Sequence, residues 1–409
     1  MTLDLTSFDA VLKQYYTNDK VENMTYQDNP LHALLPKMEQ FGGKNLPIPV
    51  IFGNPQGRSK TFSNAQTRST ATSTLSTDFV LTRVKDYSIA TIDNETLEAS
   101  KGNNNAFMEA LTTEIDGAIN ALTRSVAIGE YRDSSAALGQ VSVEPTEASG
   151  TFVVALKVVS DVHAFEVGQV IVAHSAKSGG SQRTSDGSDN SWPVAGIDRG
   201  AGTLTLTGTY DGYGTIAAND FLFVEGDRGL GISGLEAWIP YTAPDSTPFF
   251  GVDRTADVVR LAGCRLDGSA LPIEEALISG ASLVASYGHK IDHFVLSFEK
   301  YAALEKALGS KVQYVDLKAN AEIGFRGMLV NGPRGPIKVI ADQNCPQDRI
   351  YGLKLDSWKL YSLGKAVRIF SPDGLEVMRQ ASADGVEVRV NFYGNMGCKA
   401  PGANIVIKV

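Results

Sequence analysis

Residues 103–129, NNNAFMEALTTEIDGAINALTRSVAIG, form the stretch that decides the fold. Apolar side chains recur in it every three or four residues, at Phe107, Leu111, Ile115, Ile119, Leu122 and Val126. This period is typical of an α-helix with one buried face, and the run of asparagines at 103–105 offers residues that cap a helix N-terminus. We therefore predict a long amphipathic helix that ends near Gly129, despite the glycine at position 117.

The segment before this helix reads as an extended hairpin. An outgoing strand is expected at 46–52 and a returning strand at 78–84. Pro47 and Pro49 cannot donate ladder hydrogen bonds, so the outgoing strand belongs at an edge. The connection contains the Ser/Thr-rich run 69–74 and has little to bury, which predicts a long loop that is functional or docks on a partner.

The N-terminal region is interpreted as an arm. Residues 5–15 have the apolar spacing of a short helix, and a polar run follows. Residues 29–43 are interrupted by prolines and glycines and have too few apolar residues for a core of their own. We expect this arm to rest on something else.

Beyond the helix, residues 140–226 contain short β runs separated by turn residues, which suggests a small barrel or sandwich with an exposed loop at 175–191. Mixed α/β patterns follow. They predict a helix opened by Pro272, a strand at 293–296 leading into a helix capped by Ser297, a hairpin around 331–335, and strands at 386–390 and 405–409.

Composition argues against several classes of function. The chain has 409 residues, 37 basic against 46 acidic side chains and a net charge of -9, so it lacks the broad basic face of a nucleic-acid-binding protein. Its three cysteines are far apart, which indicates neither a disulfide framework nor a zinc site. No signal-peptide pattern or membrane-length apolar run occurs, so neither export nor a membrane partner is expected.

Three motifs only superficially suggest chemistry. Residues 53–59 lack the lysine and the following helix of a phosphate-binding loop. His289 and His293 are four apart, but a strand-like run follows them, so a metal site is not expected. Residues 186–190 lack the closing glutamate of a calcium loop. We predict no catalytic residues, no metal and no cofactor.

The order of elements resembles the Hong Kong 97-type coat proteins of tailed bacteriophages. The residues that carry the resemblance are Gly229 to Pro240, Phe294 to Ser297 with Leu304, Gly332 to Val339, and Cys345 to Leu353. The resemblance implies an α+β fold with an N-terminal arm, an extended loop, a spine helix, a peripheral domain and an axial domain. About ninety extra residues between the spine helix and the Gly-Leu entry look like an inserted domain on the outer surface.

The implied division of the chain is as follows: arm 1–45, extended loop 46–93, spine helix and first peripheral part 94–139, β-rich insertion 140–228, return to the peripheral domain 229–262, axial domain 263–371, and closing peripheral strands 372–409.

The resemblance further implies a non-enzymatic major capsid protein, located in the virion shell and, during assembly, in the host cytoplasm. Its partners would be copies of itself in pentamers and hexamers, a separate scaffolding protein, a portal, in some relatives a decoration protein, and packaged double-stranded DNA bound without sequence specificity. Some relatives crosslink a loop lysine to a peripheral asparagine, but no motif aligns Lys60 with Asn391 or Asn395, so we do not propose a crosslink between them.

Charge supports a docking role independently of the family. Residues 46–90 carry five basic and two acidic side chains, a net +3, whereas residues 91–133 carry three basic and eight acidic ones, a net -5. Opposite charges on a loop and a helix region suit contact between neighbouring copies, where charge fixes register. The candidate contact residues are Arg58, Lys60, Arg68, Arg83, Lys85, Glu95, Glu98, Glu109, Glu114 and Asp116. The alternative is that both regions are simply solvated faces.

Two other functions stay open. An encapsulin-type shell would use the same fold to enclose protein cargo. A carbohydrate-binding surface protein would use the β-rich residues 140–228 as its ligand module.

Overall fold

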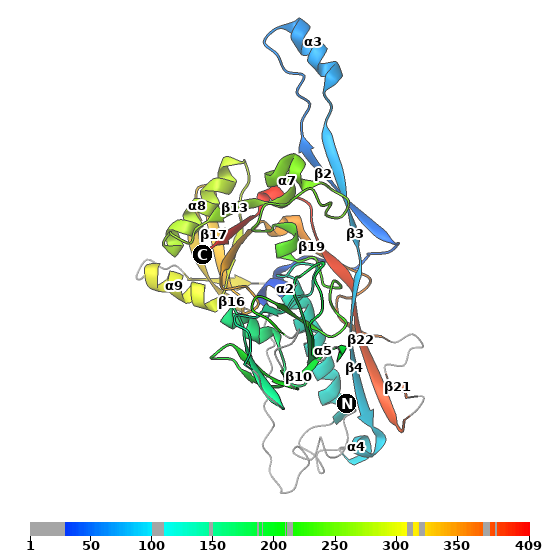
Figure 1. Ribbon diagram of the computed structural model, residues 1–409. Helices are drawn as coiled ribbons and strands as arrows, with labels where there is room; N and C mark the ends of the chain where they lie inside the picture. Colours follow the sequence, from blue (N-terminus) through cyan, green and yellow to red (C-terminus); the bar gives the residue numbers. More distant parts are fainter. Residues whose placement is uncertain are drawn as a thin grey trace.

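Three larger sheets and one long hairpin organise the chain (Figure 1). The structure is a computed structural model that describes residues 29–99, 110–146, 150–185, 188–189, 191–208, 210, 216–308, 314–318, 324–370, 377–380 and 383–409. The expected arm helix at 5–15 and the capping asparagines at 103–105 lie outside these residues.

The spine helix lies against the longest strand pairing among the described residues. Helix α5 spans Ala110–Gly129, with Leu122 and Val126 buried and Ile115 and Ile119 partly buried against the same core. It packs on β4 (Val84–Asp93) and β22 (Gly385–Cys398), which pair antiparallel over ten residues. The helix and its end at Gly129 are confirmed, and so is strand character at 386–390.

A second sheet of seven strands lies beside the first. Its order is β13 (Cys264–Asp267), β23 (Ile405–Lys408), β18 (Arg349–Leu353), β14 (His293–Leu296), β17 (Gly335–Ala341), β16 (Gly324–Gly332) and β15 (Tyr314–Lys318). Helices α8 (Ile273–Ser286) and α9 (Phe298–Leu308) add their apolar faces to its core. The expected hairpin is confirmed by the pairing of Gly332 with Gly335, and Ser297 accepts from the Lys300 amide at 3.4 Å.

The C-terminal strand corrects the expected chain division. We expected all strands of residues 372–409 to belong to the peripheral sheet, which is the sheet that contains β4 and β22. Instead, β23 pairs with β13 on one side and β18 on the other, inside the seven-stranded sheet. Three of its four side chains, Ile405 to Ile407, are fully buried, as a central strand requires. Conversely, β19 (Trp358–Ser362), which was expected in the axial domain, pairs with β22 of the peripheral sheet. The return of the chain to this sheet therefore begins before residue 372.

A closed six-stranded barrel occupies residues 139–224. Its order is β5 (Gly139–Gln140), β12 (Phe221–Val224), β7 (Val170–His174), β10 (Trp192–Asp198), β11 (Thr203–Thr207) and β6 (Thr151–Ala155). Two hydrogen bonds join the first and last strands of this order, β5 and β6, and close the barrel. The Ser142 amide donates to the Ala155 carbonyl at 2.8 Å, and the Lys157 amide donates to the Gln140 carbonyl at 2.7 Å. Phe152, Trp192 and Leu204 belong to a separate core cluster inside it. Of the two architectures expected, the barrel is the one formed.

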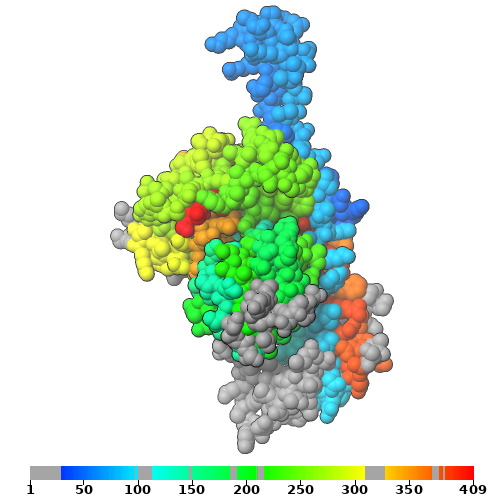
Figure 2. All heavy atoms as spheres, in the orientation of Figure 1, coloured from blue at the N-terminus to red at the C-terminus, as the bar shows by residue number. Residues whose placement is uncertain are grey.

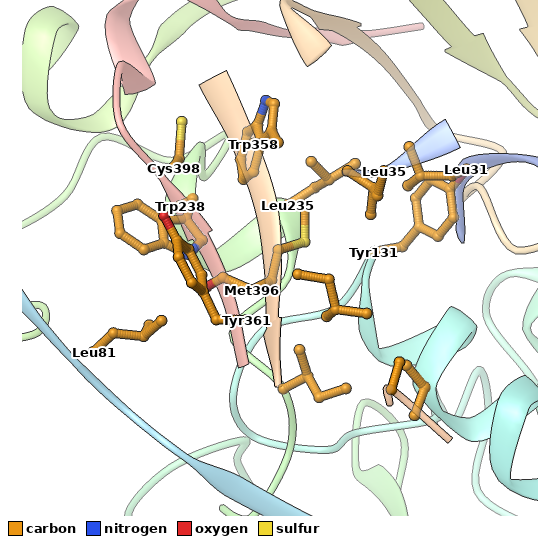
Figure 3. Close-up of a cluster of buried hydrophobic side chains, with 14 of the residues drawn as sticks. Leu31, Leu35, Leu81, Tyr131, Leu235, Trp238, Trp358, Tyr361, Met396 and Cys398 are labelled. Atoms are coloured by element: carbon orange, nitrogen blue, oxygen red, sulfur yellow. The ribbon is translucent and has the colours of Figure 1, made fainter. Parts of the chain in front are cut away.

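The segment after Asn29 rests on its own chain. Helix α2 (Pro30–Leu34) places Leu31 in the main core, beside Leu35 and Tyr131 in the cluster of Figure 3, and β1 (Lys37–Met38) pairs with β19. The Leu31 amide also donates to a carboxylate oxygen of Asp342 at 3.0 Å. The support that the arm was expected to need is therefore, for residues 29–45, the main core of the same chain, because a few well-spaced apolar residues suffice when that core supplies the other wall.

Candidate functional site

The extended loop is the most prominent feature of the surface. Strands β2 (Asn45–Gly53) and β3 (Leu75–Thr82) pair only with each other among the described residues, as an edge position for Pro47 and Pro49 predicts. Ile48, Phe79 and Leu81 are buried at the base of this hairpin. Farther out the loop leaves the body, and Figure 2 shows it standing clear of all other atoms in that view.

The tip of the loop is helical, which sequence reasoning missed. Helix α3 spans Phe62–Ala71 and buries none of its residues. Its hydroxyl side chains donate to carbonyls three or four residues earlier, for example Thr67 to Ser63 at 3.0 Å and Thr70 to Thr67 at 2.8 Å. The polar composition of this segment predicted a loop, but the segment forms a helix without an apolar face. Such a helix lacks the tertiary packing that normally supplies most helical stability.

The five basic candidates divide into two groups. Arg58, Lys60 and Arg68 are exposed at the tip, where Arg68 donates to the Arg58 carbonyl at 3.1 Å. Arg83 is at the other end of the hairpin and is used inside the chain, because it donates to the Phe41 carbonyl at 2.6 Å and its guanidinium lies 5.3 Å from the centroid of the Phe41 ring. Lys85 is exposed on β4.

The acidic candidates lie far from the tip. Glu95 and Glu98 are exposed on α4 (Asn94–Ala99), and Asp116 is exposed on α5. Glu114 on α5 is half-buried, and this burial raises its pKa. Figure 1 places α3 at one end of the molecule and α4 at the other, so the two charged groups do not meet within one chain. Glu109 lies outside the described residues.

A cluster of partly buried charges joins the barrel to the body, and sequence reasoning missed it. Lys177 of the barrel lies 2.8 Å from Asp133 and 3.0 Å from Glu236, and Arg349 lies 3.1 Å from Glu236. Burial alone would raise the pKa of Glu236, but Lys177 and Arg349 outweigh it and lower the pKa from 4.5 to about 2. The only sequence signal was that Glu236 falls in the Gly229 to Pro240 segment that carries the resemblance.

Two further salt bridges reinforce the same junction. Arg132, just after α5, lies 2.6 Å from Asp161 of the barrel, and Arg124 of α5 pairs with Glu166. Apart from Arg349–Glu236, which lies within the body, these pairs connect the barrel to the spine helix or to the body, so the barrel is held in a fixed orientation by more than its two chain connections.

The motifs that suggested chemistry carry no assembled site. Residues 53–59 run from the end of β2 toward α3 and do not connect a buried strand to a packed helix. His293 lies on β14, where burial and then Lys338 lower its pKa to about 4. Within the described residues no three His, Cys, Asp or Glu side chains are grouped to hold a metal, and no helix there is long and apolar enough to cross a membrane. The loop 186–190 is only partly described.

Comparisons with known proteins point to one fold. No protein-family model and no curated protein matches the sequence. The solved capsid of cyanophage A-1(L) matches with a TM-score of 0.53 and 12% identity over 97% of this chain and 96% of that one. The capsid of a native GTA particle gives 0.47 and 8% over 97% and 95%, and the holo-SrpI encapsulin of Synechococcus elongatus gives 0.44 and 8% over 100% and 95%.

The cyanophage match is one of fold, because 12% identity is too low to transfer residue roles. It extends over nearly the full length of both chains, so it includes the extended loop, the spine helix and both large sheets together. This chain therefore has the Hong Kong 97-like fold that the order of its elements predicted, and shares it with the solved cyanophage capsid.

Proposed function

We propose that the protein is a structural capsid subunit that assembles through pentamers and hexamers into an icosahedral shell enclosing double-stranded DNA. The observation that carries the proposal is the protruding β2–α3–β3 loop, whose terminal helix buries no residue in its own chain. A helix of ten residues without tertiary contacts is marginal in water. Contact with another copy supplies the missing packing.

The charges of the loop and the spine region support contact between neighbours. The exposed basic side chains at the tip, Arg58, Lys60 and Arg68, would approach acidic side chains of an adjacent copy. Because exposed pairs contribute less than about 1 kcal/mol each, their role would be to fix register, and buried area would supply the affinity. Arg83 is no longer proposed as a contact residue, because its side chain donates a hydrogen bond to the Phe41 carbonyl of its own chain.

The remaining partners are part of the same proposal. A separate scaffolding protein and a portal would direct assembly, and the barrel at 139–224 would be an insertion on the outer surface that can receive a decoration protein. The net charge of -9 is consistent with a shell that encloses DNA without binding its phosphates tightly.

The test is to express the full chain with and without a co-expressed scaffold and to examine the lysate by electron microscopy. Closed shells of uniform diameter in the lysate support the capsid role. Particles purified from infected cells that contain nuclease-protected DNA support the enclosure of double-stranded DNA. Shells that contain protein cargo and no DNA would instead indicate a storage compartment. A chain that stays monomeric at high concentration and binds glycans would replace the proposal with a carbohydrate-binding role.

A further inference from the structure

A cavity of about 200 Å³ lies where the spine helix, strand β4 and the barrel meet. It is open to solvent on one side, and its wall is mainly apolar, with contributions from Ala121, Ile128, Leu138, Val224, Leu230 and Ile232. Leu230 is 62% exposed at this site, so the apolar surface reaches the exterior. An exposed apolar hollow of this kind on a folded protein usually marks a binding site.

Two carboxylates that border the cavity, Asp86 and Asp227, form no salt bridge with any side chain in the described part of the chain. Asp86 accepts a hydrogen bond from the Ser125 hydroxyl at 2.6 Å, and Asp227 lies on the connection after β12. Burial raises the pKa of both groups, and the negative charge of Asp86 raises that of Asp227 further. Unpaired carboxylates that are partly removed from water are stabilised when a cation arrives.

The basic groups that border the cavity do not neutralise these carboxylates. Arg124 is committed to Glu166 and Arg132 to Asp161. Lys85 is exposed, and no salt bridge joins it to an acidic group within the described residues. The cavity thus offers an apolar interior with negative charge beside it.

The tip of the extended loop has the complementary chemistry. Phe62, the first residue of α3, is 83% exposed, the largest exposed fraction among the large apolar side chains described. Lys60 lies two residues earlier and is also exposed. In one chain the tip and the cavity are widely separated: the loop projects from the end of the molecule away from the barrel (Figures 1 and 2).

The volume of the cavity also suits the phenyl ring of Phe62. An engineered protein cavity of about 150 Å³ with apolar walls binds benzene. A cavity of about 200 Å³ therefore has room for one phenyl ring. Burial of an aromatic side chain is among the largest single apolar gains available at an interface.

We propose that the Phe62 ring of a second copy of this chain enters the cavity, and that its Lys60 ammonium pairs with Asp86 and Asp227. This inference rests on the proposed function, since it names the residues through which two copies would hold each other. The extended loop then acts as a knob and the junction of spine helix and barrel as its hole. The barrel helps to form the hole, through Ala164 and Val224, in addition to any role on the outer surface.

A cysteine pair tests the contact directly. Thr61→Cys places a thiol beside Phe62, and Leu230→Cys places one at the exposed edge of the cavity. The three natural cysteines are buried, with their pKa values raised by that burial, so the introduced thiols will react first. Oxidised particles of the double variant should yield covalently joined chains. Thr61→Cys with Val143→Cys, an exposed barrel position that does not border the cavity, is the matched control and should not.

Charge reversal provides the second measurement. Lys60→Glu alone and Asp227→Lys alone should each reduce the assembled fraction about tenfold, and the double variant should restore most of it. Phe62→Ala should reduce assembly at least as much, whereas Leu75→Ala, another exposed apolar residue of the loop, should have little effect.

The outcomes separate this inference from the function on which it rests. If wild-type particles form but the Thr61–Leu230 thiols do not join and the charge reversal is not restored, the knob-and-hole contact is wrong and the capsid role stands. If the wild-type chain forms no particles with a scaffold, both are overturned.

Discussion

Replacing Glu236 by Gln should destabilise the subunit by about 3 kcal/mol at neutral pH. The carboxylate is 16% exposed and lies 3.0 Å from Lys177 and 3.1 Å from Arg349. These cations lower its pKa from 4.5 to about 2 in spite of the opposing effect of burial. At about 1.4 kcal/mol for each tenfold change in proton affinity, the difference corresponds to about 3 kcal/mol.

The sign of the pH dependence follows from the lowered pKa. Unfolded Glu236 takes up a proton below its ordinary pKa of 4.5, while the folded form holds its charge to about 2. The stabilisation is therefore complete above about pH 5 and is lost as the pH falls toward 2. Urea unfolding of the full chain, followed by tryptophan fluorescence, should show a gap between wild type and variant of about 3 kcal/mol at pH 7 and about 1 kcal/mol at pH 3.

The control is Glu225→Gln on the exposed surface of the barrel, which should change the free energy of unfolding by less than about 0.5 kcal/mol. A gap below about 1 kcal/mol at pH 7, or one of the same size at both pH values, would refute the assignment of Glu236 as the charged centre of the junction.

Three more substitutions test the packing, each by the same urea unfolding. Leu31→Ala should cost about 3 kcal/mol by leaving a cavity in the main core, and an unchanged stability would show that this segment does not rest on its own chain. His32→Ala should cost about 3 kcal/mol because the buried Glu130 carboxylate loses a partner at 2.7 Å; a neutral effect would contradict that pairing. Gly263→Ala should destabilise more than Gly43→Ala by at least about 1 kcal/mol: both have positive φ, but only at Gly263 would the new methyl meet another side chain, at 2.5 Å. Equal losses would leave backbone strain as the sole cause.

The candidate contact residues show how far sequence patterns reach. Counting charges separated a basic loop from an acidic helix region, and the structure places α3 and α4 at opposite ends of the molecule. The count did not distinguish Lys60, which is exposed at the tip, from Arg83, which donates a hydrogen bond to the Phe41 carbonyl. Side-chain partners across long sequence separations are not encoded in local composition.

Local periodicity by itself determined the spine helix, the hairpin at Gly332 to Gly335 and most strands, because the spacing of apolar residues dictates which face each element can bury. Only the tertiary structure decided where β23 pairs, since a strand buried on both faces has no pattern that selects a neighbour. It alone also assembled Glu236 with Lys177 and Arg349, and it alone formed the cavity beside the barrel. Those features depend on distances between segments far apart in the chain, which are set by packing of the whole core rather than by any single stretch of sequence.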